Sequence, residues 1–456
     1  MTDEGWAANE FSEVELGDKR RKKRLIRLAE QRSENPNGSI SASCGDKAGT
    51  KAAYRFLDNE AVGAEAILES HYQASVERAS QESVVLAVQD TTEVNYTTHP
   101  EAQGLGYLQG LTIRGLLMHS TMLVTPQRVP LGLIDQQVWA RSDAEFQVDR
   151  ENRKALPTEV KESQKWLVSL EATAHFQQRL GHTRLINVGD SEADIFDLFR
   201  KARQLGQDIL IRATTNRLVD HAEHSLRNFL RHQPVAGELL LQVQRHGTQP
   251  ARKAQLEIRF AQVSIRAPQR RKKENLPSVQ LWAVFAQEVH APAGVEAIDW
   301  LLLTTIPVDT FDQALTCMTW YSCRWVIETY HKVLKSGCRI EERQFGDTEN
   351  LQRYLAVDAI VAWRVLYLTM IGRDQPDLPC SVILATHEWQ ALFCFIHHTR
   401  QPPQTPPSLR EATRWIAQLG GFLGRKSDGS PGPMTVWRGL QRLSDIADAW
   451  LVFRHA

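Results

Sequence analysis

Three carboxylates are the residues best suited to carry chemistry. Asp90 follows an apolar run at 84–89, and Asp190 follows a second apolar run at 184–189. A carboxylate at the C-terminal end of a strand lies at the sheet edge where α/β folds bind ligands. Each aspartate taken alone is more often a helix cap or turn residue, and this applies most to Asp190, which precedes a predicted helix. The third carboxylate, Glu328, lies on another predicted helix.

A stripe of basic and aromatic residues surrounds Glu328. The segment 321–335 is predicted to be helical, and at about 100° per residue its polar side chains share one side of the helix. These are Tyr321, Arg324, Glu328, Lys332 and Lys335. The opposite side is predicted to be buried and carries Cys323, Val326, Ile327, Tyr330, Val333 and Leu334. A solvated face with i,i+4 ion pairs explains the stripe equally well, so the helix alone leaves both interpretations open.

The chemistry of three acids favours a metal site. Carboxylates that converge on one spot repel one another unless cations lie between them. Two divalent metals about 3.5–4 Å apart are the usual solution in nucleases and polymerases. Carboxylate oxygens suit Mg²⁺ or Mn²⁺. The neighbouring bases would bind phosphate, and Arg324 could do so through two hydrogen bonds.

The elements that would position these acids alternate between strand and helix, which predicts an α/β fold. Strands are expected at 84–89, 115–124, 130–139, 184–189 and 208–212, the second and third being antiparallel neighbours. Helices are expected at 161–180, 192–205, 309–336 and 347–371. A mostly antiparallel β insertion is predicted at about 236–306, with strands at 238–244, 255–265, 279–288 and 299–305.

The length of 456 residues predicts several structural units. Residues 1–70 are expected to form a helical, basic domain, with a break at Pro36-Asn37-Gly38 and a loop at 39–45. Residues 71–371 would form the catalytic domain with its insertion. Residues 372–456 would form a helical C-terminal domain, in which 401–407 is a loop rich in proline.

The net charge of zero gives no global basic signal, but the charge is unevenly distributed. Residues 19–24 are six consecutive bases. Such runs are usually solvated helix faces. Six in a row, however, cover all sides of a helix, which suits phosphate contact better. A second run, 270–273, is expected in an exposed loop of the β insertion.

The remaining composition is that of a globular protein, with 42% apolar and 24% charged residues. Six scattered cysteines form no CxxC pair, which predicts free thiols in a reducing cytoplasm and argues against a zinc site of the usual spacing. The longest apolar stretch, 355–371, is interrupted by Asp358 and Arg364. It is interpreted as a buried helix and not as a membrane span.

Tyr321, Arg324, Glu328 and Lys335 have the spacing Tyr-x2-Arg-x3-Glu-x6-Lys. This pattern resembles the YREK signature of bacterial cut-and-paste transposases of the insertion-sequence-four family. The segments 90–92 and 188–194 resemble the family's first and second acid motifs. Further similarity is found in the segments 16–21, 53–56, 300–304 and 420–440, so that the resemblance covers nearly the whole chain.

The resemblance implies an RNase H-like catalytic core with a β insertion between helical terminal domains. It implies that Asp90, Asp190 and Glu328 bind two Mg²⁺ or Mn²⁺ ions. Tyr321, Arg324 and Lys335 would contact the phosphates of the transposon end, Arg212 would lie near that DNA, and Trp300 would stack on a nucleotide flipped out when the DNA end closes into a hairpin. The head that resembles the family's DNA-binding domain includes Arg20, Arg21, Lys22 and Lys23.

The implied partners are double-stranded DNA and a second copy of the chain, in a cytoplasmic protein without a membrane span. A metal-dependent nuclease without strand transfer is the principal alternative, although it would not need Trp300 or the C-terminal tail. A non-enzymatic DNA-binding protein would give no reason for three acids in motif order. A carboxylate-pair glycosidase would not explain the bases around Glu328.

Overall fold

The computed structural model describes residues 5–99, 101–110, 112–142, 160–243, 252–292, 294–425 and 428–453. The chain divides into two compact units. Unit 1 comprises residues 1–79, 91–147 and 326–456, and unit 2 comprises residues 80–90 and 148–325. Strand β1 (Val84–Asn95) contributes its first half to unit 2 and its second half to unit 1.

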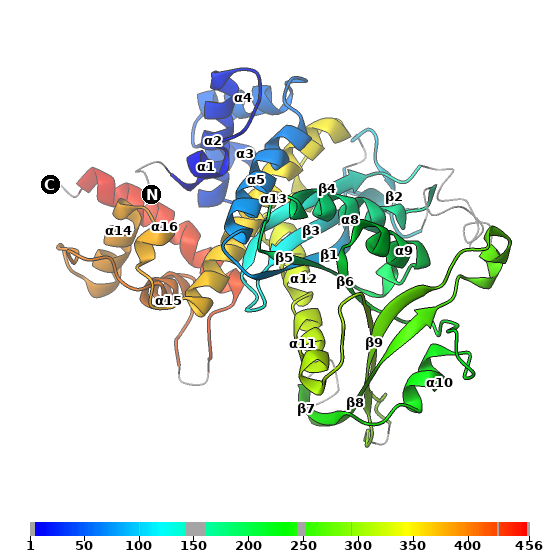
Figure 1. The fold of residues 1–456 in the computed structure, drawn as a ribbon. Helices are drawn as coiled ribbons and strands as arrows, with labels where there is room; N and C mark the ends of the chain where they lie inside the picture. Colours follow the sequence, from blue (N-terminus) through cyan, green and yellow to red (C-terminus); the bar gives the residue numbers. More distant parts are fainter. Residues whose placement is uncertain are drawn as a thin grey trace. The chain divides into compact units, whose positions relative to one another are not determined.

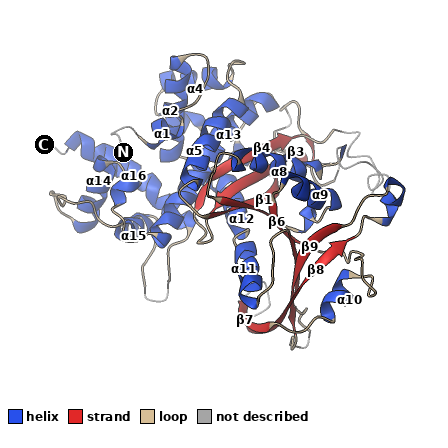
Figure 2. Cartoon of the chain, in the orientation of Figure 1, coloured by secondary structure: helices blue, strands red, loops and turns tan. Residues whose placement is uncertain are grey.

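Unit 2 is built on a mixed sheet whose strand order is β1-β5-β6-β10-β9-β8-β7. Figures 1 and 2 show β8 and β9 as long neighbouring strands of this sheet. Strands β1, β5 and β6 are parallel neighbours, and each later neighbouring pair from β6 onward is antiparallel. The bounds are β5 Arg184–Gly189, β6 Asp208–Arg212, β7 Gly237–Val243, β8 Arg252–Ile265, β9 Val279–Glu288 and β10 Asp299–Thr304.

The predicted β insertion is confirmed as four antiparallel strands, and the structure adds how it is attached. Strand β10 pairs with β6, so the insertion extends the central sheet and does not form a separate one. The bounds agree with prediction to within a few residues. The predicted end of the first insertion strand, residue 244, lies outside the described residues.

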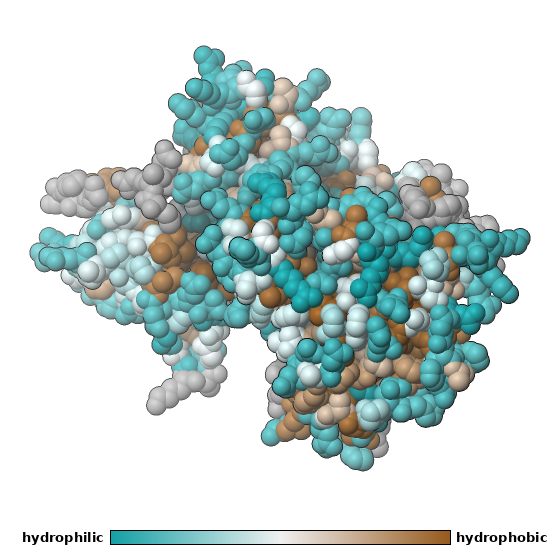
Figure 3. Space-filling model, viewed as in Figure 1, coloured by the Kyte–Doolittle hydropathy of each residue, from teal (hydrophilic) through white to brown (hydrophobic). Residues whose placement is uncertain are grey.

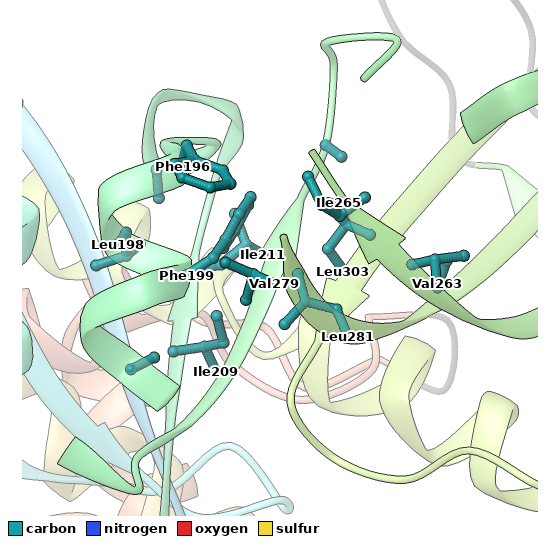
Figure 4. Close-up of a cluster of buried hydrophobic side chains, with 14 of the residues drawn as sticks. Phe196, Leu198, Phe199, Ile209, Ile211, Val263, Ile265, Val279, Leu281 and Leu303 are labelled. Atoms are coloured by element: carbon teal, nitrogen blue, oxygen red, sulfur yellow. The ribbon is translucent and has the colours of Figure 1, made fainter. Parts of the chain in front are cut away.

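One face of the unit 2 sheet packs against helices α8 (Gln164–Gln177) and α9 (Phe196–Leu205). Phe196 and Phe199 of α9 meet Ile209 and Ile211 of β6 in a buried cluster that continues to Leu303 of β10 (Figure 4). Burial of each such side chain stabilises the fold by roughly 1.5–3 kcal/mol. Because Ile209 and Ile211 point to this face, the alternate residues of β6 point to the other.

Unit 2 has four further helical elements among its described residues. They are the 3₁₀ turn η2 Ser191–Ala193, α10 Leu226–Arg231, the 3₁₀ turn η3 Gln269–Glu274 and α11 Phe311–Ser322. A capping box at Thr310 and Gln313 begins α11. Apolar side chains gather on the surface over the β7–β9 end of this unit (Figure 3), where Leu240 of β7 is 63% exposed.

Unit 1 is mostly helical. Its helices are α1 Trp6–Glu10, α2 Lys19–Glu34, α3 Ile40–Cys44, α4 Lys47–Leu57, α5 Ala64–Ala79, α12 Trp325–Lys332 (whose first residue belongs to unit 2), α13 Thr348–Asp374, α14 Thr386–His397, α15 Leu409–Leu419 and α16 Pro433–Phe453, with short turns at Val333–Gly337, Ile340–Glu342 and Cys380–Val382. Its strands are β2 Gly106–Tyr107, β3 Arg114–Val124 and β4 Pro130–Trp139. The predicted antiparallel pairing of β3 with β4 is confirmed.

Helix α13 contains the apolar stretch noted in the sequence. Within the described residues it is the one helix long and apolar enough to cross a membrane, and 83% of its most apolar window is buried inside the protein. Asp358, one of the two charged residues that interrupt the stretch, is itself fully buried and pairs with Arg32 of α2. The helix is therefore a core element of unit 1, as the sequence predicted.

Two local predictions are corrected. Residues 40–44, expected in a loop, form the short helix α3, because the Ser39 side chain accepts a hydrogen bond from the Ala42 backbone and caps it. The single helix expected over 309–336 is divided: α11 ends at Ser322, α12 begins at Trp325, and a π-helical turn occupies Val333–Gly337. The predicted stripe from Tyr321 to Lys335 is therefore divided among three segments.

The buried side of that segment and the cysteines agree with prediction. All six apolar side chains predicted to face inward between residues 323 and 334 are buried. All six cysteines are buried thiols outside disulfide bonds.

Candidate active site

Asp90 and Asp190 lie side by side on the unit 2 sheet. The last paired residues of the parallel strands β1 and β5 are Val88 and Val188, and each aspartate follows two residues later. Neighbouring strands are about 4.8 Å apart, and residues at the same register position point to the same face. The two aspartates therefore follow neighbouring strands at equivalent positions and point to the same face of the sheet.

The setting of Asp90 differs from the prediction. Strand β1 does not end at residue 89 but continues to Asn95, so Asp90 lies inside the strand. The next residue, Thr91, belongs to unit 1 and is hydrogen-bonded through its hydroxyl to Nδ1 of His119 on β3, at 2.9 Å. The strand therefore continues beyond the acid because it has further partners in unit 1.

Asp190 follows β5 directly, as predicted, and it is also a cap. Its Oδ1 accepts a hydrogen bond of 2.8 Å from the Glu192 backbone and begins the turn η2. Burial raises the pKa of the Asp190 carboxyl, while that hydrogen bond and the charges of Arg324 and Lys165 act in the opposite direction. The cap orients one oxygen of Asp190 and does not exclude a ligand at the other.

Arg212 lies in the same row as the two acids. The parallel register of β5 and β6 ends at Gly189 opposite Ile211, so Asp190 and Arg212 follow at equivalent positions. Arg212 pairs across to Leu302 of β10. Because Ile211 and Leu303 belong to the buried cluster on one face, Arg212 projects from the other face.

Tyr321 and Arg324 approach this row from the end of α11. Arg324 is buried, and its Nη1 lies 3.7 Å from Oδ2 of Asp90. Burial raises the pKa of the Tyr321 hydroxyl, and the charges of Arg324 and Arg212 act against this rise, while that of Asp190 adds to it. The Tyr321 side chain is also hydrogen-bonded to Arg324. Unit 2 itself therefore brings together five of the predicted site residues.

Trp300 is the second residue of β10 and lies two residues before Leu302, the partner of Arg212. Its side chain is partly buried, which separates it from the fully buried Leu301 and Leu303 that follow. In this unit Trp300 is a partly buried tryptophan near the end of a strand.

Glu328 and Lys335 belong to unit 1. Glu328 is a partly buried residue in the first turn of α12. Lys335 lies in the π-helical turn, and its Nζ donates to the Glu93 carbonyl at 2.8 Å and pairs with Glu341 at 3.3 Å. Lys335 therefore contributes to the structure of unit 1, whatever else it binds.

Two residues near the site were not identified from the sequence. Lys165 on α8 is buried and pairs with Glu192 at 3.0 Å, which holds the turn that orients Asp190. Trp325 is 60% exposed, and the guanidinium of Arg324 lies 5.3 Å from its ring centroid. For Lys165, the acid at position 192 in the sequence could have indicated a partner. The exposure of Trp325 could not be predicted, because the sequence indicated one continuous helix around it.

The oxygen donors of the acid pair fit a hard divalent cation such as Mg²⁺. Within the ranges that the structure describes, no three histidine, cysteine, aspartate or glutamate side chains are grouped so that they could hold a metal ion. In the described residues Asp90 and Asp190 are therefore a pair, and no third such side chain is grouped with them.

The predicted basic run 19–24 lies at the start of α2, which Asp18 caps. Arg20 and Lys23 are exposed. Arg21 donates to the Leu16 carbonyl at 2.8 Å, and Lys22 donates to the carbonyl of Ser12. Half of the four bases predicted to contact DNA are therefore also bound to the preceding loop.

Three family models match the chain. A transposase DNA-binding model matches residues 3–62, a transposase DDE domain model matches residues 143–363, and a Tn5-type transposase dimerisation model matches residues 360–452. The DDE match includes Asp190 and Glu328, while Asp90 lies in the unmatched segment 63–142. The mixed α/β fold with helical ends and a DDE domain is RNase H-like.

Proposed function

We propose that this chain, which carries the DNA-binding, DDE and dimerisation domains of a DDE-type DNA transposase, cuts the ends of its transposon and joins them to target DNA. The cut would pass through a hairpin intermediate, and the freed 3′ ends would attack the target. The four residues Tyr321, Arg324, Glu328 and Lys335 would place it in the insertion-sequence-four family.

The observation that carries this proposal is the row of Asp90, Asp190 and Arg212 with Tyr321 and Arg324 beside it. Two carboxylates lie next to two guanidinium groups in this row. The carboxylates are suited to bind a metal ion, and the guanidinium groups are suited to bind phosphate. Phosphoryl transfer depends on positioning and on electrostatic stabilisation of the phosphate oxygens, which are the tasks such groups perform. A purely structural pair of acids would not need two arginines and a tyrosine around it.

Glu328 is the proposed third acid. It follows Trp325, the last residue of unit 2, by three residues within α12, which corresponds to about 4.5 Å of helix rise. This proximity along the helix supports a position near Arg324. Two Mg²⁺ or Mn²⁺ ions, held by the three acids, would activate the attacking oxygen and stabilise the leaving oxygen.

The remaining proposed contacts are with DNA and with a second copy of the chain. Arg324, Tyr321, Arg212 and Lys335 would bind phosphates near the cut, and the bases of α2 would bind the transposon end. Residues 1–70, 71–371 and 372–456 would be the DNA-binding, catalytic and dimerisation domains. The active form would be a homodimer on paired ends in the cytoplasm, without a membrane span.

Two tryptophans are candidates to stack on a base that leaves the helix at the hairpin. Trp300 lies at the start of β10 and Trp325 is exposed next to Arg324. Stacking of a base on an aromatic ring contributes roughly 1–3 kcal/mol, which offsets part of the cost of unstacking. A plain nuclease, the alternative function, needs no such platform.

The test is to incubate the purified protein and Mg²⁺ with DNA that carries the ends of its own element. Hairpin-ended fragments support the transposase, and nicked or linear fragments without hairpins support the nuclease. Trp300→Ala should permit the first nick but impair the hairpin step, and Trp325→Ala is compared with it. If Trp300→Ala reduces the nick and the hairpin by the same factor, Trp300 acts through fold or binding.

A further inference from the structure

A cavity of about 300 Å³ lies within unit 2, next to the segment that carries Asp190. Its wall includes four basic side chains and two carboxylates, with two hydroxyl groups between them. The basic residues are Lys161, Arg217, Arg270 and Arg271, the acids are Asp194 and Asp197, and the hydroxyls belong to Ser163 and Thr215. The positive excess favours an anionic ligand.

The carboxylates in the wall are already neutralised. Asp194 is 1% exposed, and it accepts hydrogen bonds from Arg217 at 2.7 Å and from the Thr215 backbone at 3.0 Å. Asp197 pairs with Arg271. The acids therefore hold the arginines in place and do not make the cavity attractive to a cation.

Arg217 lines the cavity and has an unused hydrogen-bond donor. Its side chain is 9% exposed, and its bonds to Asp194 use Nε and Nη2. Among the residues that the structure describes, Nη1 has no hydrogen-bond partner. A buried guanidinium with an unused donor in the wall of a cavity is suited to bind an oxyanion.

The start of α9 adds positive potential to the same cavity, which Ile195, Phe196 and Asp197 also line. Helix α9 has ten residues, and its N-cap is Ile195, which makes no side-chain capping bond. The first N–H groups of a helix bind anions readily, and here no capping side chain competes for them.

We propose that this cavity binds a phosphate of the DNA backbone, at a position separate from the phosphate that is cut. The proposal rests on the proposed function. Asp190 and Asp194 flank the turn η2. Four residues at about 2.0 Å per residue in a 3₁₀ turn separate them by roughly 8 Å. This distance is about two nucleotide steps of 3.4 Å along one strand. A strand whose phosphate lies at the acids thus reaches the cavity within a few nucleotides.

The basic run 270–273 contains residues that line the cavity and residues that do not. Arg270 and Arg271 line the cavity, whereas Lys272 and Lys273 are exposed on the same turn η3 and do not line it. Lys273→Ala is therefore a matched control for Arg270→Ala, because both remove one positive charge from the same six-residue turn. Both residues are exposed, so neither substitution should disturb folding, which a thermal melt verifies.

The experiment measures DNA affinity against salt concentration by fluorescence anisotropy, for wild type, Arg270→Ala, Lys161→Ala and Lys273→Ala. Two DNAs are used separately: a duplex with the transposon end, and a target duplex added to the preformed paired-end complex. Binding weakens as salt rises, so the slope of log K against log[salt] is negative. Loss of one phosphate contact reduces the magnitude of this slope by about 0.9. We expect this loss for Arg270→Ala and Lys161→Ala and an unchanged slope for Lys273→Ala.

The DNA on which the slope falls identifies the source of the phosphate, either the transposon end or the target. The proposal is overturned if Arg270→Ala keeps the wild-type slope on both DNAs, or if Lys273→Ala lowers the slope as much as Arg270→Ala does. Wild-type cleavage is measured in parallel. If the wild type cuts its ends but Arg270→Ala binds DNA with the wild-type slope, only the proposed phosphate site in the cavity is wrong. If the wild type neither binds nor cuts DNA, the proposed transposase function is wrong as well.

Discussion

Two arginine–carboxylate pairs, one in each unit, differ in the distance between their charged groups and in their exposure to solvent. In unit 1 Arg32 binds Asp358 through two hydrogen bonds, of 2.9 and 3.0 Å, and both side chains are 0% exposed. In unit 2 Arg324 lies 3.7 Å from Asp90, whose side chain is 19% exposed. The first pair is bonded and closed to solvent, whereas the second is held by charge at a distance beyond a hydrogen bond.

The difference separates a pair that stabilises the fold from one suited to bind ligands. Arg32 also donates to the carbonyls of Asn35 and Gly38, so its donors serve to join α2, the following turn and α13. We propose that the wider pair in unit 2 serves a metal at the carboxylate and a phosphate at the guanidinium. Loss of an acid should therefore affect stability in unit 1 and catalysis in unit 2.

The largest expected effect is on cleavage. Asp190→Asn keeps an oxygen that can accept the Glu192 hydrogen bond but removes the charge that a metal requires. We expect cleavage of transposon ends to fall to the detection limit while end binding and the melting temperature stay close to wild type. Asp90→Asn and Glu328→Gln should behave alike. Near-normal cleavage by any one variant would remove that residue from the site.

The second effect is on stability. Asp358→Ala leaves the Arg32 guanidinium buried without its counter-ion, which typically costs about 3–5 kcal/mol of unfolding free energy. Asp90→Ala removes a pair at 3.7 Å whose acid is 19% exposed, so we expect a smaller loss than for Asp358→Ala. Urea denaturation of both variants measures the difference. Equal losses would show that the two pairs do not differ in the way proposed.

A smaller effect is expected on DNA binding by α2. Arg20 and Lys23 are exposed, whereas Arg21 and Lys22 donate to the carbonyls of Leu16 and Ser12. Arg20→Ala with Lys23→Ala should lower the salt slope of end binding by about 0.9 for each lost phosphate contact. Arg21→Ala with Lys22→Ala should lower the slope less and the melting temperature more. The reverse order would mean that the exposed pair is merely solvated.

The smallest effect concerns a carboxylate that has acidic neighbours instead of an arginine. Burial and the charges of Asp448, Glu30 and Glu388 raise the pKa of Glu34 from 4.5 to about 7. The folded state therefore holds a proton that the unfolded state releases, so this group lowers stability as pH rises from about 4.5 to 7.

Glu34→Gln should abolish that decline and raise the melting temperature at pH 8 relative to pH 4.5. The gain should be a few degrees at most, because Glu34 is crowded by neighbours yet still reached by solvent, which screens the repulsion. Glu15→Gln, an exposed glutamate in the same unit, is the control. A melting temperature of Glu34→Gln that follows the wild-type pH dependence would contradict the assignment.

The sequence by itself determined most elements and the order of the chemical groups. Periods of two and of 3.6 residues report the local backbone, so the insertion strands, the long α13 and the buried side of 323–334 could be predicted. The position of Asp190 after a strand was predicted for the same reason. The motif spacing gave the site residues, of which unit 2 brings Asp90, Asp190, Arg212, Tyr321 and Arg324 together.

Only the tertiary structure decided which groups meet. Strand β1 continues past Asp90 because its second half has partners in unit 1, and no pattern within the strand reports them. Arg32 and Asp358 are 326 residues apart, so their closed pair could not be distinguished in the sequence from an ordinary surface charge and a helix interruption. The cavity beside Asp194 likewise assembles residues between 161 and 271. Local periodicity reports the backbone of one segment, whereas strand register and the choice of ionic partners depend on segments distant along the chain.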